Sequence, residues 1–377
     1  MPWSTTTVSE RRTALIHAVR TAHVPLARAC RDFGVSRKTA YKWLARYDTH
    51  PDQPLDDHSR RPLTCPTRTP SDQEATVLEV RDRFGWGPRK IVAYLRAQGR
   101  LAPPVRTAAA ILARHHRITP PTPVPAADQR FERPEPNQLW QVDFKGFIWV
   151  GRQKVYPLTI LDDHSRYLVG AQPCRDQTMA TAWAVLWRLF ADVGLPDAIL
   201  CDNAFGAHTT GVPTLSWFDG QRLRLGIRPI HGRPYHPQTQ GKVERFHGTL
   251  VRELWPTIRR DTLEHFTDDL ATWRTTVYNA VRPHEALGDR PPVSRWCPSR
   301  RPCPPTVPEV VYPAGATLRR VTCHGDIGWR SARLLIGRGL AGQKVQVEPT
   351  DQELILRYAG HEIRRVPLAL LGSGGKL

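Results

Sequence analysis

Three proline-rich stretches divide this chain into parts that have to fold separately. The second stretch holds six prolines between Pro120 and Pro136, and the third holds eight between Pro291 and Pro313. Because proline fixes φ and removes a backbone donor, such stretches sustain neither a helix interior nor a central strand, and they act as semi-rigid spacers. A chain of 377 residues is also too long for one ordinary core. We therefore expect domains at residues 1–50, 71–117, 137–300 and 314–371, joined by linkers at 51–70, 118–136 and 301–313.

The first of these domains has the pattern of a helix-turn-helix. Two apolar helical stripes lead to Gly34-Val35, which reads as a tight turn, and Ser36 is a good N-cap for a third helix that buries Trp43. A recognition helix inserts its N-terminal polar side chains into the major groove of DNA. The outward-facing side chains that we expect to contact DNA are Arg37, Lys38, Thr39, Tyr41 and Lys42. An ordinary helical hairpin is the alternative reading.

Residues 71–117 predict a second all-helical unit. A first helix reaches about Arg83, and the next begins after Gly87 with Pro88 at its first position, where proline is favoured. A third helix follows Pro104. The pattern is compatible with a second DNA-binding unit and with a purely structural bundle.

The segment 137–300 alternates between strand and helix patterns. Strand patterns occupy 138–150, 154–162, 166–174, 197–202 and 227–231, and helix patterns occupy 177–193, 214–225, 238–255 and 261–281. Three consecutive strands followed by alternating helix and strand is the order of an RNase H-like α/β sheet. After residue 313 the pattern changes to short strands separated by glycine turns, which predicts a small β-barrel.

Three acidic residues in the central segment occupy settings that suit a metal-bound carboxylate. Asp143 and Asp202 each end an apolar strand pattern, and Glu244 lies beside the apolar face of a helix pattern. Two strand-end carboxylates facing a helix carboxylate make a hard-oxygen site of the kind that holds one or two Mg²⁺ ions. Asp162 and Asp163, close to Asp143 in sequence, are alternative ligands, although the run around them reads as a turn between strands.

The contexts of these acids resemble, motif by motif, the DDE transposases of bacterial insertion sequences and the retroviral-type integrases. The resemblance covers roughly residues 137–300 and is carried by Trp140 to Asp143, Leu161 to Arg166, Cys201-Asp202-Asn203, His236-Pro237-Gln238 through Glu244-Arg245, and Arg282-Pro283-His284. It implies an integrase-type catalytic core with Asp143, Asp202 and Glu244 as the triad and as the metal ligands. The chain departs from the family in the 41 residues between Asp202 and Glu244, whose extra length we place at residues 206–211.

The resemblance further implies a transposase that binds insertion-sequence ends and catalyses metal-dependent cleavage and strand transfer. We expect two Mg²⁺ ions, with Mn²⁺ able to substitute, double-stranded DNA at the element ends and target as partner, and self-association into a dimer or higher oligomer on DNA. The residues near the triad that we expect to hold DNA are His236, Gln240, Lys242 and Arg245. The alternative function is a transposase-derived DNA-binding regulator without catalysis.

Charge and cysteine usage agree with this reading. The formal net charge is +19, which suggests a polyanionic partner. Seven cysteines without a Cys-x-x-Cys pair indicate neither a disulfide framework nor a zinc ribbon. The sequence shows no signal peptide and no long apolar run, so we expect a cytoplasmic protein of a bacterium, associated with the nucleoid, with no membrane partner.

Overall fold

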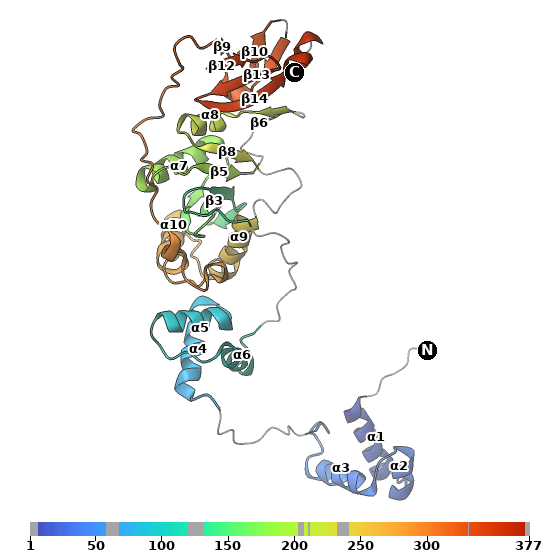
Figure 1. Ribbon diagram of the computed structural model, residues 1–377. Helices are drawn as coiled ribbons and strands as arrows, with labels where there is room; N and C mark the ends of the chain where they lie inside the picture. Colours follow the sequence, from blue (N-terminus) through green and yellow to red (C-terminus); the bar gives the residue numbers. More distant parts are fainter. Residues whose placement is uncertain are drawn as a thin grey trace. The chain divides into compact units, whose positions relative to one another are not determined.

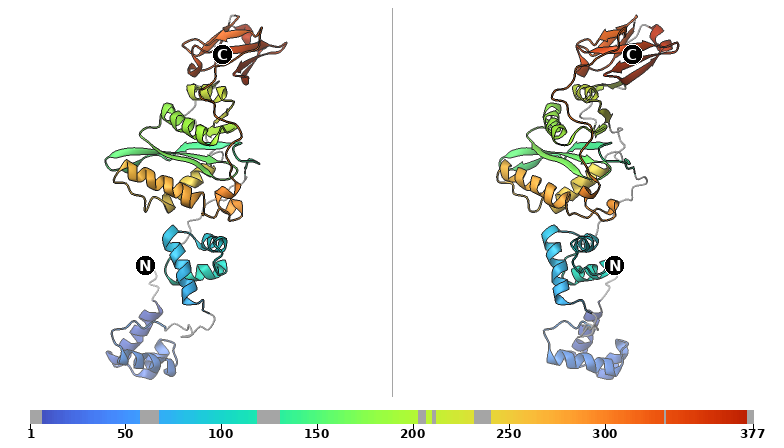
Figure 2. Two further views of the ribbon diagram at one scale, coloured as in Figure 1. Left: turned by 90° about the vertical axis from the view of Figure 1, so that its left-hand side faces the viewer. Right: turned by 60° about the vertical axis from the view of Figure 1, so that its left-hand side comes forward.

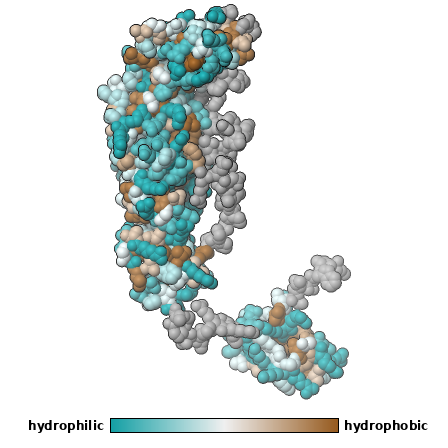
Figure 3. Space-filling view, in the orientation of Figure 1, coloured by the Kyte–Doolittle hydropathy of each residue, from teal (hydrophilic) through white to brown (hydrophobic). Residues whose placement is uncertain are grey.

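The structure is a computed structural model that describes residues 7–57, 68–118, 131–202, 207–209, 212–231, 241–330 and 332–373. The chain divides into two compact units, Met1–Arg68 and Thr69–Leu377. Figure 1 labels the elements of both units in the order of the sequence. On the face drawn in Figure 3, hydrophilic residues prevail and apolar ones form scattered patches.

The first unit is a three-helix domain with two apolar clusters, one of which contains Trp43. Its helices are α1 (Val8–Arg20), α2 (Leu26–Asp32) and α3 (Arg37–Thr49). The Ser36 hydroxyl accepts a hydrogen bond from the backbone N–H of Thr39 at 3.1 Å, which confirms the predicted N-cap of α3. Trp43 of α3 is buried, and the Arg12 guanidinium lies 3.8 Å from the centre of its ring. The predicted helix-turn-helix is therefore present.

The second unit begins with three further helices, α4 (Ser71–Phe84), α5 (Pro88–Ala97) and α6 (Val105–Arg114). Pro88 occupies the first turn of α5, as its sequence context predicts. Trp86, in the turn between α4 and α5, is fully buried and stacks on Phe84 with ring centres 4.2 Å apart. Val277 and Val281, from the central domain, pack against the apolar cluster of these helices.

A mixed six-stranded sheet forms the central domain. Its strands are β1 (Trp140–Phe144), β2 (Ile148–Val150), β3 (Gln153–Asp162), β4 (Leu168–Cys174), β5 (Ala198–Cys201) and β8 (Arg228–His231). Strands β1 and β2 pair with successive parts of β3, and β4 pairs with β3 as well. Strand β5 runs parallel to β1 and β8 parallel to β5, so the antiparallel strands β1 to β4 are followed by two strands parallel to β1.

Helices cover both faces of this sheet, as Figure 2 shows. Helix α7 (Met179–Val193) packs on one face, where Trp140, Val142, Leu158 and Ile160 join its cluster. Helices α9 (Gly241–Glu253) and α10 (Leu263–Thr272), followed by the π-helical turn η3 (Trp273–Tyr278), pack on the other face. The predicted RNase H-like order of elements is thus confirmed for the described residues.

The extra length between Asp202 and Glu244 contains a short hairpin. Strands β6 (Ala207–Thr209) and β7 (Val212–Thr214) pair antiparallel within the region where the sequence suggested an insertion. Helix α8 (Trp217–Arg224) follows and leads into β8. The chain has no helix among its described residues that is long and apolar enough to span a bilayer.

The C-terminal segment consists of short strands, as predicted. Its strands are β9 (Leu318–Arg320), β10 (Asp326–Trp329), β11 (Ala332–Leu335), β12 (Lys344–Pro349), β13 (Glu353–Tyr358) and β14 (His361–Pro367). They make a four-stranded antiparallel sheet in the order β14-β13-β12-β9 and a separate hairpin of β10 and β11. Over the residues that the structure describes, β9 and β14 are the edges of this sheet, so a closed barrel is not confirmed.

Candidate active site

Asp143 lies near the carboxyl end of β1, on the side of the sheet that α9 covers. The Asp143 Oδ2 atom is 3.7 Å from Nδ1 of His247, a buried residue of α9. The Thr159 hydroxyl donates to the Asp143 carbonyl oxygen at 3.1 Å and lies 2.8 Å from Nε2 of His247. Because a hydroxyl has one proton, that bond to the carbonyl makes Nε2 of His247 the donor to Thr159.

The carboxyl group of Asp143 is held in an environment that opposes its ionisation. Burial raises the pKa of Asp143 to about 7, and the charges of Asp202 and Glu244 add to the shift. Burial lowers the pKa of His247 to about 3, so the imidazole is neutral at pH 7 and does not form an ion pair with Asp143. The site therefore sets Asp143 near two other acids, and the charge of Lys145 offsets only part of the rise in its pKa.

Asp202 is placed beside Asp143 by strand register. Val142 of β1 pairs with Cys201 of the parallel strand β5, and each of these residues is followed directly by an acid. Adjacent parallel strands present their carboxyl ends at the same edge of a sheet, which is where ligands bind in open α/β folds. Both Asp143 and Asp202 are partly buried at that edge.

A buried ion pair beneath β5 supports Asp202, and the sequence patterns did not reveal it. Arg222 of α8 is fully buried and donates to the Ile199 carbonyl at 3.1 Å and to Cys201 Sγ at 3.6 Å. Its guanidinium pairs with Asp219, whose Oδ1 also lies 2.9 Å from Nε2 of His231. Burial favours the neutral acid, but the hydrogen bond from His231 and the charge of Arg222 hold the pKa of Asp219 at about 2. The contacts among Arg222, Asp219 and His231 hold the end of β5, which Asp202 directly follows.

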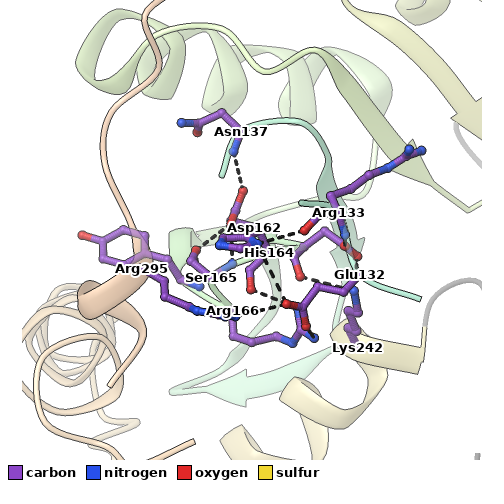
Figure 4. Close-up of polar contacts among 11 residues, drawn as sticks. Glu132, Arg133, Asn137, Asp162, His164, Ser165, Arg166, Lys242 and Arg295 are labelled. Carbon is purple, nitrogen blue, oxygen red and sulfur yellow. Dashed lines mark hydrogen bonds and ion pairs between the residues drawn. The ribbon is translucent and has the colours of Figure 1, made fainter. Parts of the chain in front are cut away.

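Glu244 lies exposed on the first turn of α9, and a buried network fixes that turn (Figure 4). Lys242 Nζ donates to Asp163 Oδ1 at 2.5 Å and to the Asp163 carbonyl at 3.2 Å. Gln141 Nε2 donates to the same carboxylate at 2.9 Å, while Gln141 Oε1 accepts from the Val243 backbone N–H at 3.3 Å. The helix terminus that carries Glu244 is thus tied to β1 and to the turn after β3.

The same network shows what Asp162 and Asp163 do. Asp162 accepts hydrogen bonds from the Asn137 N–H at 2.8 Å and from the Ser165 N–H and hydroxyl at 2.8 and 2.6 Å. Asp163 Oδ2 accepts from the Arg133 N–H at 2.8 Å. Both side chains are completely buried, so these acids stabilise the turn and do not face the site as ligands.

The predicted DNA-contacting residues fall into three groups. Arg37, Lys38, Tyr41 and Lys42 are exposed along α3, and Thr39 is half-buried against Ser36. Arg245 is exposed next to Glu244, whereas Lys242 is engaged in the ion pair with Asp163. His236 and Gln240 lie outside the described residues. Within the described residues, no three histidine, cysteine or acidic side chains are close enough to hold a metal ion as they stand.

Comparison with protein families agrees with this geometry. Residues 133–237 and 225–292 match integrase core domain families. The central segment is an integrase core. Residues 10–62 match a helix-turn-helix domain and residues 39–112 a homeodomain-like domain. The resemblance to DDE transposases of insertion sequences, with an integrase-type core, is confirmed.

Similar proteins come from insertion elements and retroviruses. The chain is 28% identical over 161 residues to an uncharacterized 39.2 kDa protein of insertion element IS476 from Xanthomonas euvesicatoria, covering 42% of this chain and 43% of that protein. It is 32% identical over 133 residues to the Gag-Pro-Pol polyprotein of squirrel monkey retrovirus, covering 35% of this chain and 7% of the polyprotein. The matched part of this chain thus spans less than half the length of either relative.

Two solved structures show weaker similarity. A chain of the simian T-cell lymphotropic virus intasome, in complex with the PP2A regulatory subunit B56 gamma, has a TM-score of 0.38 and 14% identity, over 78% of this chain and 96% of that chain. The HTLV-2 integrase catalytic core domain in complex with magnesium has a TM-score of 0.30 and 17% identity, over 43% of this chain and 97% of that chain.

Proposed function

We propose that this chain is a transposase that binds the ends of its own insertion element and catalyses DNA cleavage and strand transfer. Asp143, Asp202 and Glu244 act as the catalytic carboxylates. The observation that carries the proposal is the state of Asp143, whose pKa burial and two neighbouring acids raise to about 7 within an integrase core. Perturbed acids of this kind cluster at functional sites.

The donor set fits a divalent cation. Carboxylate oxygens are the ligands that Mg²⁺ and Mn²⁺ prefer, and the mutual repulsion of the three acids is relieved by a bound cation. Asp143, Asp202 and Glu244 would hold one or two ions, which polarise the phosphate and activate the attacking oxygen. His247 is neutral at pH 7, so its imidazole does not compete with a bound cation for the Asp143 carboxylate. The buried pair of Asp219 and Arg222 keeps Asp202 in place through the end of β5.

DNA recognition is assigned to exposed basic and polar side chains. Arg37, Lys38, Tyr41 and Lys42 of α3 read or grip the element end, and Arg245 contacts DNA beside Glu244. Arginine and lysine supply the phosphate contacts that dominate affinity for DNA. Self-association on DNA is part of the proposal, because a transposase has to bring two element ends together.

The test is strand transfer with pre-cleaved DNA from the element's own ends. Asp143→Asn, Asp202→Asn and Glu244→Gln are each expected to abolish transfer while DNA binding in a gel-shift assay persists. The matched controls Asp268→Asn and Glu264→Gln, which change exposed acids of α10, should retain activity. Substantial transfer by any triad variant would remove that residue from the assignment.

The same assay distinguishes the catalytic proposal from a DNA-binding regulator. Mg²⁺ or Mn²⁺ should support transfer, whereas Ca²⁺, which is larger and accepts looser geometry, should allow the DNA complex to assemble without reaction. Full activity in EDTA would contradict the metal mechanism. Binding of element ends without transfer in any metal would identify a regulator.

A further inference from the structure

The hairpin of β2 and β3 exposes aromatic side chains that the core does not require. Phe147 and Trp149 are each 53% exposed, although both are large and apolar. The alternate residues Ile148 and Val150 pack with the cluster beneath α9 and α10, as the two-residue period of a strand dictates. The exposed residues of this hairpin therefore lie on the opposite face, where the described structure leaves them in contact with solvent.

These residues form one patch, which we call the aromatic hairpin face: Phe147, Trp149, Lys154 and Tyr156. The ring centres of Phe147 and Trp149 are 6.2 Å apart and edge to face, and those of Phe147 and Tyr156 are 6.3 Å apart. Lys154 Nζ lies 4.6 Å from the Phe147 ring centre and 5.6 Å from that of Trp149. A single ammonium group is thus held next to two exposed rings.

The hairpin is rigid, so the face is preorganised. Trp149 pairs with Lys154 across the two strands, and the Gly151 N–H at the tip donates to the Arg260 carbonyl. Gly151 has a φ of +55°, and a Cβ atom there would lie 2.9 Å from the Asp261 carbonyl oxygen. Because the tip is anchored to the loop after α9, movement of the hairpin does not bury the rings of Phe147 and Trp149.

The positive charge of residues 144–161 favours a polyanion as the partner of this face. Between Asp143 and Asp162 the sequence holds Lys145, Arg152 and Lys154 and no acidic residue. Asp261, in the anchoring loop, is paired with His265 at 2.8 Å. A second copy of a chain with a net charge of +19 is electrostatically the weaker match, and a nucleic acid is the stronger one.

The position of the face favours an unpaired strand over a duplex. Chain connectivity puts Phe147 directly beyond the carboxyl end of β1, the sheet edge that Asp143 and Asp202 share. Lys154 and Tyr156 point to the same face of the sheet as Leu158, the face that α7 covers. Asp143 points to the opposite face, where it lies beside His247 of α9. DNA that touches both places has to turn around the end of the sheet, and duplex DNA is too stiff for so tight a turn, with a persistence length of about 150 base pairs.

We propose that the aromatic hairpin face binds an unpaired DNA strand next to the catalytic site. One or two bases stack on Trp149 and Phe147, and the Lys154 ammonium meets the adjoining phosphate. Bases expose their ring faces only when unpaired, and aromatic residues beside cations form the usual platform for them. The inference rests on the proposed function only in that both place DNA beside Asp143.

The experiment measures binding of the full-length chain in EDTA to a fluorescent dT20 strand and to a blunt 20-base-pair duplex. Trp149→Ala and Phe147→Ala are expected to weaken binding of dT20 about tenfold or more and to change duplex binding less than twofold. Trp149→Phe should retain most of the affinity, because it keeps a ring. Lys154→Gln should reduce the salt dependence of dT20 binding by about one phosphate contact.

Controls separate this proposal from misfolding and from the catalytic proposal. Trp217→Ala removes another exposed tryptophan, one outside the aromatic hairpin face, and should leave dT20 binding unchanged. Melting temperatures of all variants should match wild type. Equal losses on strand and duplex would overturn the proposal, as would a change from dimer to monomer in Trp149→Ala by sedimentation, which would mark a protein interface. Because EDTA excludes catalysis, an inactive triad would leave these results intact.

Discussion

Asp143 occupies a position where its own charge is unfavourable. Its side chain is 19% exposed, it stands near two other acids, and the nearest imidazole is neutral. In the absence of a bound cation, such a carboxyl group is more stable protonated than ionised below about pH 7. The ionisation of Asp143 should therefore make the folding stability depend on both pH and metal binding.

One prediction concerns the Asp143→Asn variant in metal-free protein. The folded-state pKa of about 7 lies above the ordinary value of 3.8, so the folded state holds the proton more tightly than the unfolded state. Wild type should lose stability as pH rises from about 4 to about 7, by up to ~4 kcal/mol, and stay level above pH 7. The asparagine variant lacks this loss, so its advantage should grow over that window in urea unfolding of the core. A constant difference across pH would contradict the shift.

Added Mg²⁺ or Mn²⁺ should make wild type more stable than the Asp143→Asn variant, the reverse of their order without metal. A ligand that binds only the folded state stabilises it according to its concentration and affinity. Wild type should gain stability at pH 8, and Asp143→Asn should gain much less.

The positions of the candidate acids were easier to predict than the residues that support them. Asp143 and Asp202 were recognisable because each ends an apolar strand pattern, and their proximity follows from the pairing of β1 with β5. The group of Asp219, Arg222 and His231 was not recognisable. Its contacts depend on how α8 packs under β5 and on the register of β5 with β8, and no local pattern encodes either.

Helix α9 is the element on which the site depends most, because its first turn carries Glu244. The contacts of Lys242 and Val243 with Asp163 and Gln141 determine where that turn begins. Asp163 is completely buried and the Lys242 side chain is 18% exposed, so this is an internal ion pair and not a surface one. Internal pairs respond strongly to removal of one partner and weakly to removal of both.

We predict that Asp163→Asn and Lys242→Met each destabilise the central domain by roughly 3 kcal/mol, since each leaves a buried partner uncompensated. The double variant should lose much less than the sum of the two. Urea unfolding gives the energies, and amide exchange at Val243 to Phe246 reports the first turn of α9 directly. Additive losses with unchanged exchange would show that the pair does not hold the helix.

Helix α3 carries the prediction for DNA reading. Arg37→Ala or Lys42→Ala should reduce discrimination between element ends and unrelated DNA by roughly 1–3 kcal/mol if the side chain contacts a base edge. Competition binding at fixed salt measures this. Equal weakening on all sequences would indicate phosphate contacts instead, and no change would remove α3 from the interface.

Element types were largely predictable, whereas sheet closure was not. The helices α3, α5 and α7 and the strands β3 and β5 follow from capping residues and apolar periodicity. The C-terminal strands were also recognisable as strands. Whether the outer strands β9 and β14 meet depends on twist and loop length rather than on the alternation of any one strand, so the predicted barrel is not confirmed.

Within the second unit, Glu253 joins the helical segment to the central domain. It lies at the far end of α9 from Glu244, and its side chain is 7% exposed. The carboxylate accepts hydrogen bonds from Trp86 Nε1 at 2.9 Å, from Lys90 at 2.9 Å and from Arg282 at 2.7 Å. Val277 and Val281 add apolar contact across the same boundary. Helices α4 to α6 are therefore packed onto the central domain.

We predict that Glu253→Ala separates these two parts. It leaves Lys90 and the buried Arg282 uncompensated, so stability should fall by roughly 3–5 kcal/mol. In calorimetry the transition of the second unit should broaden or split into two. Glu79→Ala, which removes an exposed pair with Arg100, should change little. An unaltered transition in Glu253→Ala would show that the boundary does not depend on this acid.

The contacts of Glu253 limit how the DNA sequence that such a protein recognises can change. Helices α4 to α6 cannot be exchanged without disturbing the helix that carries Glu244, whereas residues 7–57 form a compact domain with its own core. Natural divergence and deliberate retargeting should therefore both proceed by replacement of that leading domain. A hybrid that swaps only those residues for another DNA-reading domain should keep the chemistry and change the sequence on which it acts.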